Sequence, residues 1–131
     1  MFGLKRETDY AIQFLQFLDT KKKSFRSLRE FSQKSGISFW FLQKIARKLN
    51  LAGVVEAEQG VNGGYRLSQP IKKISLYKVF EVMEGKPAIT PCLRCEKYSC
   101  VNYNKKCSVK KITKKLNKNI IKMLQNITIS V

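Results

Sequence analysis

The stretch at 27–68, "SLREFSQKSGISFWFLQKIARKLNLAGVVEAEQGVNGGYRLS", constrains the fold more than any other part of this chain. Ser27 and Glu30 form a capping-box pattern, which predicts the start of a short helix that Gly36 ends. Ser38 is placed to cap a second helix over 39–49, so about four residues that include a glycine join the two helices. This arrangement is typical of a helix-turn-helix.

A β-hairpin is predicted directly after the second helix. Two short strands, at 54–57 and 65–68, flank a tip at 59–64 whose Asn-Gly and Gly-Gly pairs tolerate positive φ. The tip "QGVNGG" superficially resembles a phosphate-binding loop, but no Lys-Ser/Thr follows it and it opens no helix. A helix-turn-helix followed by a hairpin predicts a winged helix.

Further helices are predicted on both sides of this unit. Apolar residues at helical spacing predict one helix over 8–18, which Thr8 or Asp9 would cap, and another that begins after Ser75 and stops at Gly85. The fold class we expect is therefore mainly α, a winged helix-turn-helix with a small β-hairpin wing and a long C-terminal dimerisation helix.

The charge of the chain points to a polyanionic partner. Lys and Arg outnumber Asp and Glu by 26 to 9, which gives a net charge of +17 and a pI near 10.0. No apolar run approaches the roughly 18 residues that span a bilayer, and the N-terminus lacks a signal-peptide layout, so we expect a cytoplasmic protein with no membrane partner. The absence of histidine excludes His-based catalysis and His-ligated zinc, no nucleophile–base pair is visible, and we expect no enzyme.

The second helix of a helix-turn-helix carries the side chains that meet base edges, and double-stranded DNA is the expected partner. Gln43 suits adenine, while Lys44 and Arg47 suit guanine or phosphate. The aromatic run beside them has core packing as its alternative, which we favour for Phe41. The residues predicted to contact DNA are Ser38, Phe39, Trp40, Gln43, Lys44 and Arg47 of this helix and Gln59 and Asn62 of the wing.

All four cysteines lie in one short segment, at Cys92, Cys95, Cys100 and Cys107. Stable disulfides are uncommon in the cytoplasm, so the cluster indicates metal binding or redox chemistry. The spacing matches neither a paired zinc knuckle nor the ferredoxin patterns. Zinc and an iron–sulfur cluster therefore both stay open at this point, with a thiol switch as a third possibility.

The last predicted helix is amphipathic. Its apolar residues from Val109 to Ile127 follow spacings of three and four, and its lysines fall on other faces. The apolar stripe must be buried on its own domain or on a second copy, and the loop before the helix favours a second copy. We expect a DNA-binding domain at 1–86, a cysteine-rich loop at 87–107 that has no helical period, and a dimerisation helix at 108–131.

Three parts of the chain together resemble the Rrf2 family of bacterial transcription regulators. They are "TDYAIQFL", the stretch at 27–68 with its L-x-x-A-G-[LV]-V and G-x-x-G-G-Y-x-L runs, and a cysteine loop before a final long helix. The resemblance implies a homodimeric winged-helix DNA-binding protein whose C-terminal helices cross. One departure lies in the wing, where relatives often have Arg and this chain has Gln59.

The resemblance also implies a [2Fe–2S] or [4Fe–4S] cluster on three cysteines and a fourth ligand. Cys92, Cys100 and Cys107 fit the three-cysteine pattern, and the fourth ligand is either Cys95 or Asp9 of the other subunit. The alternative role for Asp9 is to cap its helix. The function that follows is a regulator that senses redox, nitric oxide or iron–sulfur status.

Competing interpretations remain at the level of sequence. In the same class are a zinc-stabilised regulator without sensing and a regulator with a thiol switch. In other classes are a small iron–sulfur electron carrier and a basic protein that binds RNA or a membrane surface. Salt-dependent, sequence-selective DNA binding separates the regulators from the rest.

Overall fold

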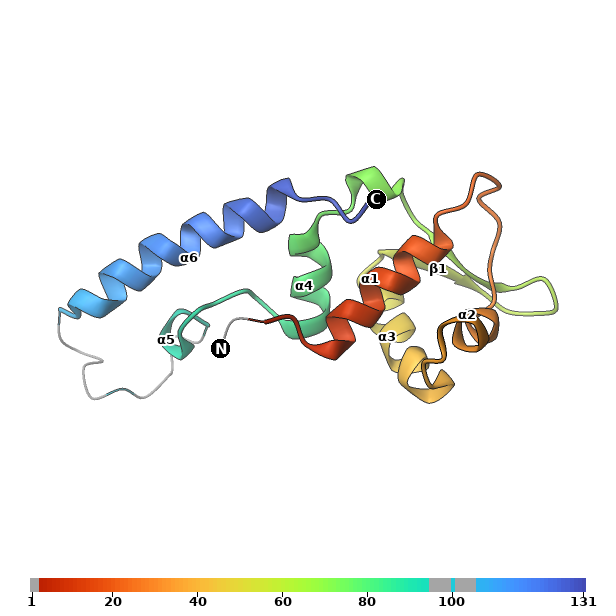
Figure 1. Ribbon diagram of the computed structural model, residues 1–131, viewed down its shortest axis with the longest axis horizontal. Helices are drawn as coiled ribbons and strands as arrows, with labels where there is room; N and C mark the ends of the chain where they lie inside the picture. Colours follow the sequence, from red (N-terminus) through yellow and green to blue (C-terminus); the bar gives the residue numbers. More distant parts are fainter. Residues whose placement is uncertain (1–2, 95–99, 101–105) are drawn as a thin grey trace.

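The computed structural model describes residues 3–94, 100 and 106–131, and it forms a winged helix from which one long helix extends. In Figure 1 the winged helix lies to the right and the long helix α6 runs along the upper left. The elements are α1 (Arg6–Leu18), α2 (Leu28–Ser35), α3 (Phe39–Leu51), β1 (Val55–Glu58), β2 (Gly64–Leu67), the 3₁₀ turn η1 (Ile71–Lys73), α4 (Leu76–Glu84), α5 (Pro91–Arg94) and α6 (Ser108–Asn126).

The core lies where α1, α3 and α4 meet. Phe14, Leu42 and Val79 are completely buried there, one from each helix. The expected cap of α1 is wrong, because the helix begins at Arg6 and its N-cap, Lys5, makes no side-chain bond. Thr8 is instead fully buried, and its hydroxyl donates a hydrogen bond to Glu84 at the end of α4.

The first helix of the helix-turn-helix begins and ends where the sequence predicted, but only part of the predicted capping is present. The Ser27 hydroxyl accepts hydrogen bonds from the first-turn backbone N–H groups of α2, and Gly36 ends that helix at φ 74°. Glu30 does not return to Ser27 as in a complete capping box. Its carboxylate lies 2.9 Å from the Arg26 guanidinium and 3.0 Å from the Lys34 ammonium. Ser38 precedes α3 without a side-chain cap bond.

The wing is an antiparallel pair in which Val55 faces Leu67 and Glu58 faces Gly64. Each strand is displaced by one residue from its predicted range. Gly64 has a φ of 140°, and a Cβ atom there would collide with the backbone carbonyl of Arg26. That close approach exists because Arg26 pairs with Tyr65 through two backbone hydrogen bonds of 2.8 Å, which fasten the base of the wing to the start of α2.

The C-terminal helix is held to the domain at one end. α6 packs on α4, and the chain then turns back so that the Ile129 N–H donates to the Ile74 carbonyl at 3.1 Å. Ile129 is only 5% exposed. The other end of α6 extends away from the domain (Figure 1). No helix in the described ranges is long and apolar enough to span a membrane.

The segment expected to be a plain loop at 87–107 contains the short helix α5, so that prediction is corrected. Its entry is fixed by Asn117 of α6, the most buried polar side chain on that helix. The Asn117 amide accepts the Ile89 N–H at 3.0 Å and donates to the Pro87 carbonyl at 3.4 Å. Two backbone groups of this segment are thereby hydrogen-bonded to α6. Residue spacing in the sequence did not predict this contact.

Candidate nucleic-acid interface and cysteine segment

The outer face of α3 is polar, basic and open to solvent. Gln43, Lys44 and Arg47 are exposed on it, and Trp40 at its amino-terminal end is 77% exposed. The opposite face of α3 is buried in the core. Ser38 is also exposed directly before the helix. The fold therefore presents most of the predicted DNA-contacting side chains of this helix together on one surface.

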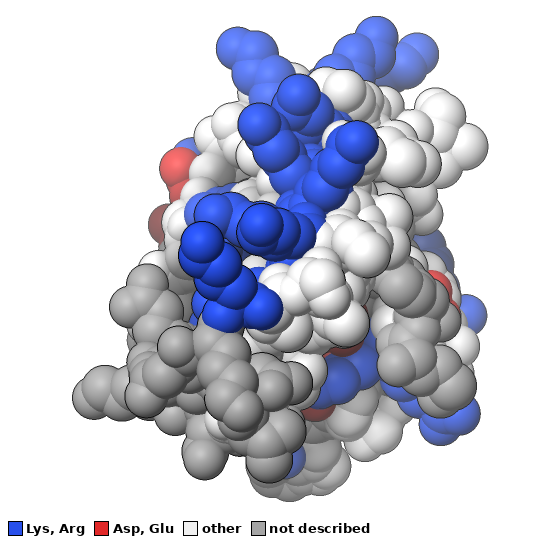
Figure 2. All heavy atoms as spheres, turned by 90° about the vertical axis from the view of Figure 1, so that its left-hand side faces the viewer, with Lys and Arg blue, Asp and Glu red and all other residues white. Residues whose placement is uncertain are grey.

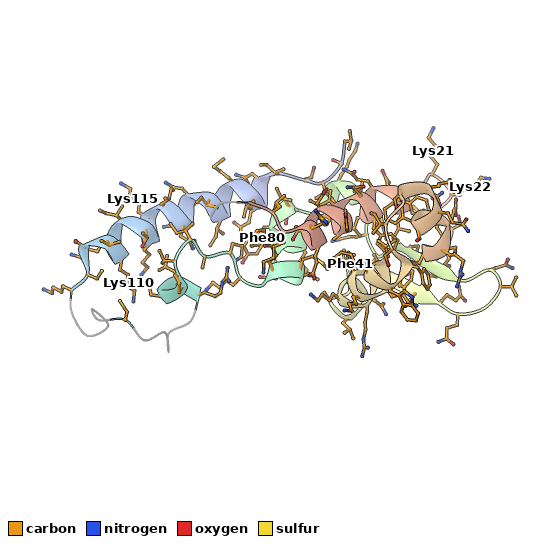
Figure 3. The ribbon with its side chains drawn as sticks, turned by 60° about the horizontal axis from the view of Figure 1, so that its bottom comes forward. Lys21, Lys22, Phe41, Phe80, Lys110 and Lys115 are labelled. Atoms are coloured by element: carbon orange, nitrogen blue, oxygen red, sulfur yellow. The ribbon has the colours of Figure 1, made fainter. Side chains whose placement is uncertain are left out.

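Aromatic residues beside Trp40 have different environments. Phe41 packs against the core, and its ring meets the Tyr10 ring edge-on at a centroid distance of 5.5 Å. Phe39 is half-buried, so it contributes only part of its surface to the outer face. Figure 3 shows Phe41 among the packed helices, whereas Lys21 and Lys22 project from the loop after α1. The expectation that Phe41 belongs to the core is confirmed.

Arg29 is a basic residue of this surface that the sequence did not single out. It is exposed on α2, and its guanidinium carbon lies 4.8 Å from the centre of the Phe39 ring. This contact holds a cation beside the amino-terminal end of α3. The signal available in the sequence was an Arg two residues after the Ser27 cap, which has no distinguishing pattern of its own.

The wing tip carries the two predicted residues, Gln59 and Asn62, and both are exposed. At the base of the wing, the Arg66 Nε atom donates to Glu56 at 2.6 Å, and its guanidinium lies over the Phe25 ring at 4.4 Å. Arg66 is therefore engaged within the domain. The tip itself is polar and uncharged at the two positions predicted to contact DNA.

Three of the four cysteines, Cys92, Cys100 and Cys107, lie within the residues that the structure describes. Cys92 is half-buried in α5 with its Sγ atom 3.3 Å from the Thr90 hydroxyl, and Cys107 caps α6 by accepting the Lys110 N–H at 3.4 Å. Cys100 is exposed. Cys95 lies outside the described residues. Across the ranges that the structure describes, no three Cys, Asp or Glu side chains gather into a group that could hold a metal ion.

Asp9 joins no potential metal-binding group of three side chains within the described part of one chain. It is exposed in the first turn of α1, and its carboxylate accepts a hydrogen bond from the Gln13 amide at 3.0 Å. The alternative that Asp9 caps α1 through its side chain is wrong, because Lys5 holds the N-cap position. Asp9 is thus a solvent-facing carboxylate whose position leaves it open to a second copy.

The donor atoms of the cysteine segment suit a metal group by their chemistry. Thiolates are the usual ligands of iron–sulfur clusters and are also good zinc ligands. The Thr90 hydroxyl and the Lys110 N–H each lie within hydrogen-bonding distance of a cysteine sulfur. Hydrogen bonds to ligating sulfurs are among the features that set cluster potentials. The side chains of this segment are therefore of the types that bind an iron–sulfur cluster or zinc.

A winged helix with an exposed basic α3 face is the architecture of a DNA-binding regulator. The chain belongs to the Rrf2 family, described as iron-dependent transcriptional regulator, which matches residues 4–131.

Relatives with curated descriptions cover different shares of the chain. It is 33% identical over 97 residues to Protein aau3 of Rhizobium meliloti, which covers 74% of this chain and 63% of that protein. It is 25% identical over 123 residues to the regulator NsrR of Shouchella clausii, which covers 93% of this chain and 82% of that protein. A 40% identical match to IscR of Cereibacter sphaeroides spans 78 residues, 57% of this chain and 50% of that protein.

Solved structures share the fold at lower identity. CymR, the global cysteine regulator of B. subtilis, superposes with a TM-score of 0.75 at 19% identity and covers 98% of this chain and 94% of its own. IscR of T. potens gives a TM-score of 0.71 at 22% identity, with coverage of 98% and 83%. These likenesses establish the winged-helix fold with its long C-terminal helix.

Proposed function

We propose that this chain binds duplex DNA through the outer face of α3 and the wing, and regulates transcription in response to an iron–sulfur group. The observation that carries the proposal is the exposed α3 face of Trp40, Gln43, Lys44 and Arg47 in a member of a family of transcription regulators. We place its action in the cytoplasm, where bacterial DNA is.

The proposed DNA contacts are of two kinds: contacts that position the protein on the duplex and contacts that read its base sequence. Ser38 and the free N–H groups that begin α3 suit a phosphate, which fixes the register of the helix on the duplex. Gln43 suits the adenine edge, while Lys44 and Arg47 suit guanine or phosphate. Gln59 and Asn62 at the wing tip suit the adjacent minor groove, with weaker attraction than an Arg would give.

The regulator acts as a homodimer through α6. Its exposed apolar stripe comprises Val109, Ile112, Leu116, Met123 and Ile127, which are 47–69% exposed in one chain. A contiguous apolar face of this kind marks an interaction surface, and a second copy of α6 offers the same face in return. The dimer would place two α3 helices about 34 Å apart, one turn of DNA.

The sensing group is assigned to the cysteine segment. Cys92, Cys100 and Cys107 would ligate the cluster, and the fourth ligand would be Cys95 or the partner subunit's Asp9. When bound, an iron–sulfur cluster supplies a group whose charge or integrity responds to oxidants, nitric oxide or iron supply. The thiols, with either Cys95 or the exposed Asp9 carboxylate as the fourth ligand, would be this chain's contribution to holding it.

Contacts at the carboxyl end of α4 and just beyond it connect the cysteine segment to the helices that carry the DNA-binding surface. Asn117 ties the entry of the segment to α6, and Glu84 at the end of α4 accepts hydrogen bonds from Thr8 and the Lys5 N–H. α4 in turn packs on α1, α3 and α6. A change in how the segment packs would therefore bias the orientation of α3, as a shift between two populations.

The experiment that tests the sensing proposal is anaerobic purification with iron, sulfide and zinc measured per chain. Stoichiometric iron and sulfide with visible charge-transfer bands are expected. Cys95→Ala and Asp9→Ala then separate the two ligand sets, because only the variant that removes a ligand should lose iron. Stoichiometric zinc without iron would replace the sensor with a zinc-stabilised regulator, and no metal would leave a thiol switch.

DNA binding is tested separately. A duplex enriched from a randomised pool should be preferred over random duplex at a salt concentration where random duplex is lost. A reversible redox couple without any such preference would indicate a small electron carrier and would overturn the regulator.

A further inference from the structure

The lysines of α6 form a second basic surface, which we call the α6 lysine face and define as Lys110, Lys111, Lys114, Lys115, Lys118 and Lys122. All six are exposed. At about 100° per residue they fall within an arc of about 140°, and they extend about 18 Å along the helix axis. Figure 2, which views the end where α6 begins, shows basic side chains gathered over this helix.

This face lies apart from both surfaces already assigned. In one turn of α6, Leu116 belongs to the exposed apolar stripe, Asn117 faces the domain, and Lys118 lies on the lysine face. A second copy that covers the apolar stripe therefore leaves the lysine face open. α6 contacts the domain mainly through α4, and the DNA-binding face of α3 lies in the other half of the molecule (Figure 1).

The lysine face is unfavourable for the helix that carries it. Lys110, Lys114 and Lys118 follow one another at four-residue spacing, and like charges at that spacing repel. Lys110 and Lys111 lie near the positive end of the helix dipole, where anions are preferred. The sequence of α6 contains no Asp or Glu, and within the described residues none of the six lysines forms an ion pair. A polyanion would relieve this repulsion.

The residue types on α6 indicate which kind of polyanion its lysine face would bind. As a point charge, lysine binds phosphate with little geometric constraint, and α6 has neither an arginine for bidentate base contacts nor an aromatic residue on which a base could stack. Duplex DNA carries one charge per about 1.7 Å of axis, so the 18 Å face would meet several phosphates. An anionic membrane would need the apolar stripe buried in lipid, and that stripe is the surface proposed to face a second copy.

We infer that the α6 lysine face binds the phosphate backbone of a second duplex, without sequence preference, while α3 holds the first. One regulator would then connect two DNA segments. This proposal does not depend on the cluster or on its ligands.

The test uses the full chain bound to an immobilised duplex enriched from a randomised pool. A fluorescent 30-base-pair random duplex is then added over a range of salt concentrations, and its capture is measured per bound protein. The variant Lys110→Gln/Lys114→Gln/Lys118→Gln should lower capture at least about tenfold. The slope of log affinity against log salt should fall by about 2.7, because three phosphate contacts contribute about 0.9 each.

The matched control, Lys21→Gln/Lys22→Gln/Lys72→Gln, removes three exposed lysines elsewhere and should leave capture within about twofold of the wild type. Equal effects of the two triple variants, or no effect of either, would overturn the proposal. Binding to phosphatidylserine–phosphatidylcholine vesicles that needs the α6 lysines, together with unaffected duplex capture, would overturn it in favour of a membrane surface.

If no duplex can be enriched from the randomised pool, the proposed sequence-selective DNA binding fails, whatever the result for the lysine face. The lysine-face proposal is then decided by fluorescence anisotropy with the random duplex alone. The α6 variant should reduce the salt slope and the control variant should not. A slope that the α6 variant leaves unchanged would overturn the proposal.

Discussion

α3 and α6 are both basic amphipathic helices, yet their apolar stripes have opposite environments. In α3, Leu42 and Leu49 are 0% exposed, whereas in α6 Ile112 is 69% and Met123 is 63% exposed. α3 is surrounded by α1, α2, β1 and α4, while α6 packs mainly on α4. An amphipathic pattern therefore does not by itself determine whether its apolar stripe is covered within one chain.

The largest expected effect comes from breaking the buried stripe. Leu42→Ala should lower the free energy of unfolding by about 2–5 kcal/mol, because it removes buried methyl groups and leaves a cavity. Ile112→Ala, a similar truncation on α6, should cost less than about 1 kcal/mol at dilute protein concentration, since the side chain is already exposed in one chain. Urea unfolding of both variants measures the contrast, and equal losses would contradict it.

The next effect concerns association rather than folding. Ile112→Asp should weaken the dimer by at least about 2 kcal/mol, because it buries an unpaired charge in the proposed interface. Sedimentation equilibrium over a range of concentrations measures the dissociation constant. Gln125→Asp, on the same helix but away from the stripe, is the matched control. A dimer that Ile112→Asp leaves intact would show that α6 is not its interface.

On the exposed side of α3, a loss of binding without a loss of stability is expected. Arg47→Ala should weaken binding to the enriched duplex by about 1–3 kcal/mol, because a base or phosphate contact disappears. The midpoint of urea unfolding should stay unchanged. Lys86→Ala, an exposed cation beyond α4, is the control and should retain affinity. Equal losses in the two variants would indicate general attraction rather than a recognition helix.

The smallest expected effect concerns Glu30. Its carboxylate pairs with two cations, whereas the sequence of α6 has no acidic residue to pair with its lysines. Hydrogen bonds from Lys34 and Arg26 lower the pKa of Glu30 from its ordinary value. A lowered folded-state pKa contributes stability above the unfolded-state pKa of about 4.3, and this contribution disappears as pH falls through the lower folded value. Glu30→Gln should therefore cost below about 1 kcal/mol at pH 7 and nothing in acid. A deficit that persists or grows at low pH would contradict this assignment.

The helix-turn-helix was predictable because its signals are local. Ser27, Gly36 and Ser75 act within one turn of their own helices, and the structure places helix boundaries at each. The strand ranges were wrong by one residue, because their ends depend on where Arg26 pairs with Tyr65, a contact between distant segments. The assignment of a cap to Thr8 failed for the same reason, since its partner is Glu84.

The candidate sites show the same division. The outward residues of α3 follow from helical spacing, and their exposure agrees with it. The half-burial of Phe39 and the Arg29 contact depend on how α2 packs beside α3, which spacing does not encode. The short helix α5 and its anchor Asn117 were missed because one buried amide has no periodic signature.

By itself, the sequence determined the Ser27 and Ser75 caps, the apolar stripes, the charge and the four clustered thiols, because each depends on residues close together in the chain. The tertiary structure alone decided which stripe is covered within one chain, that Thr8 bonds to Glu84, and that Ile129 returns to the core. Those outcomes depend on segments far apart in sequence, and their geometry is fixed only when the whole domain packs.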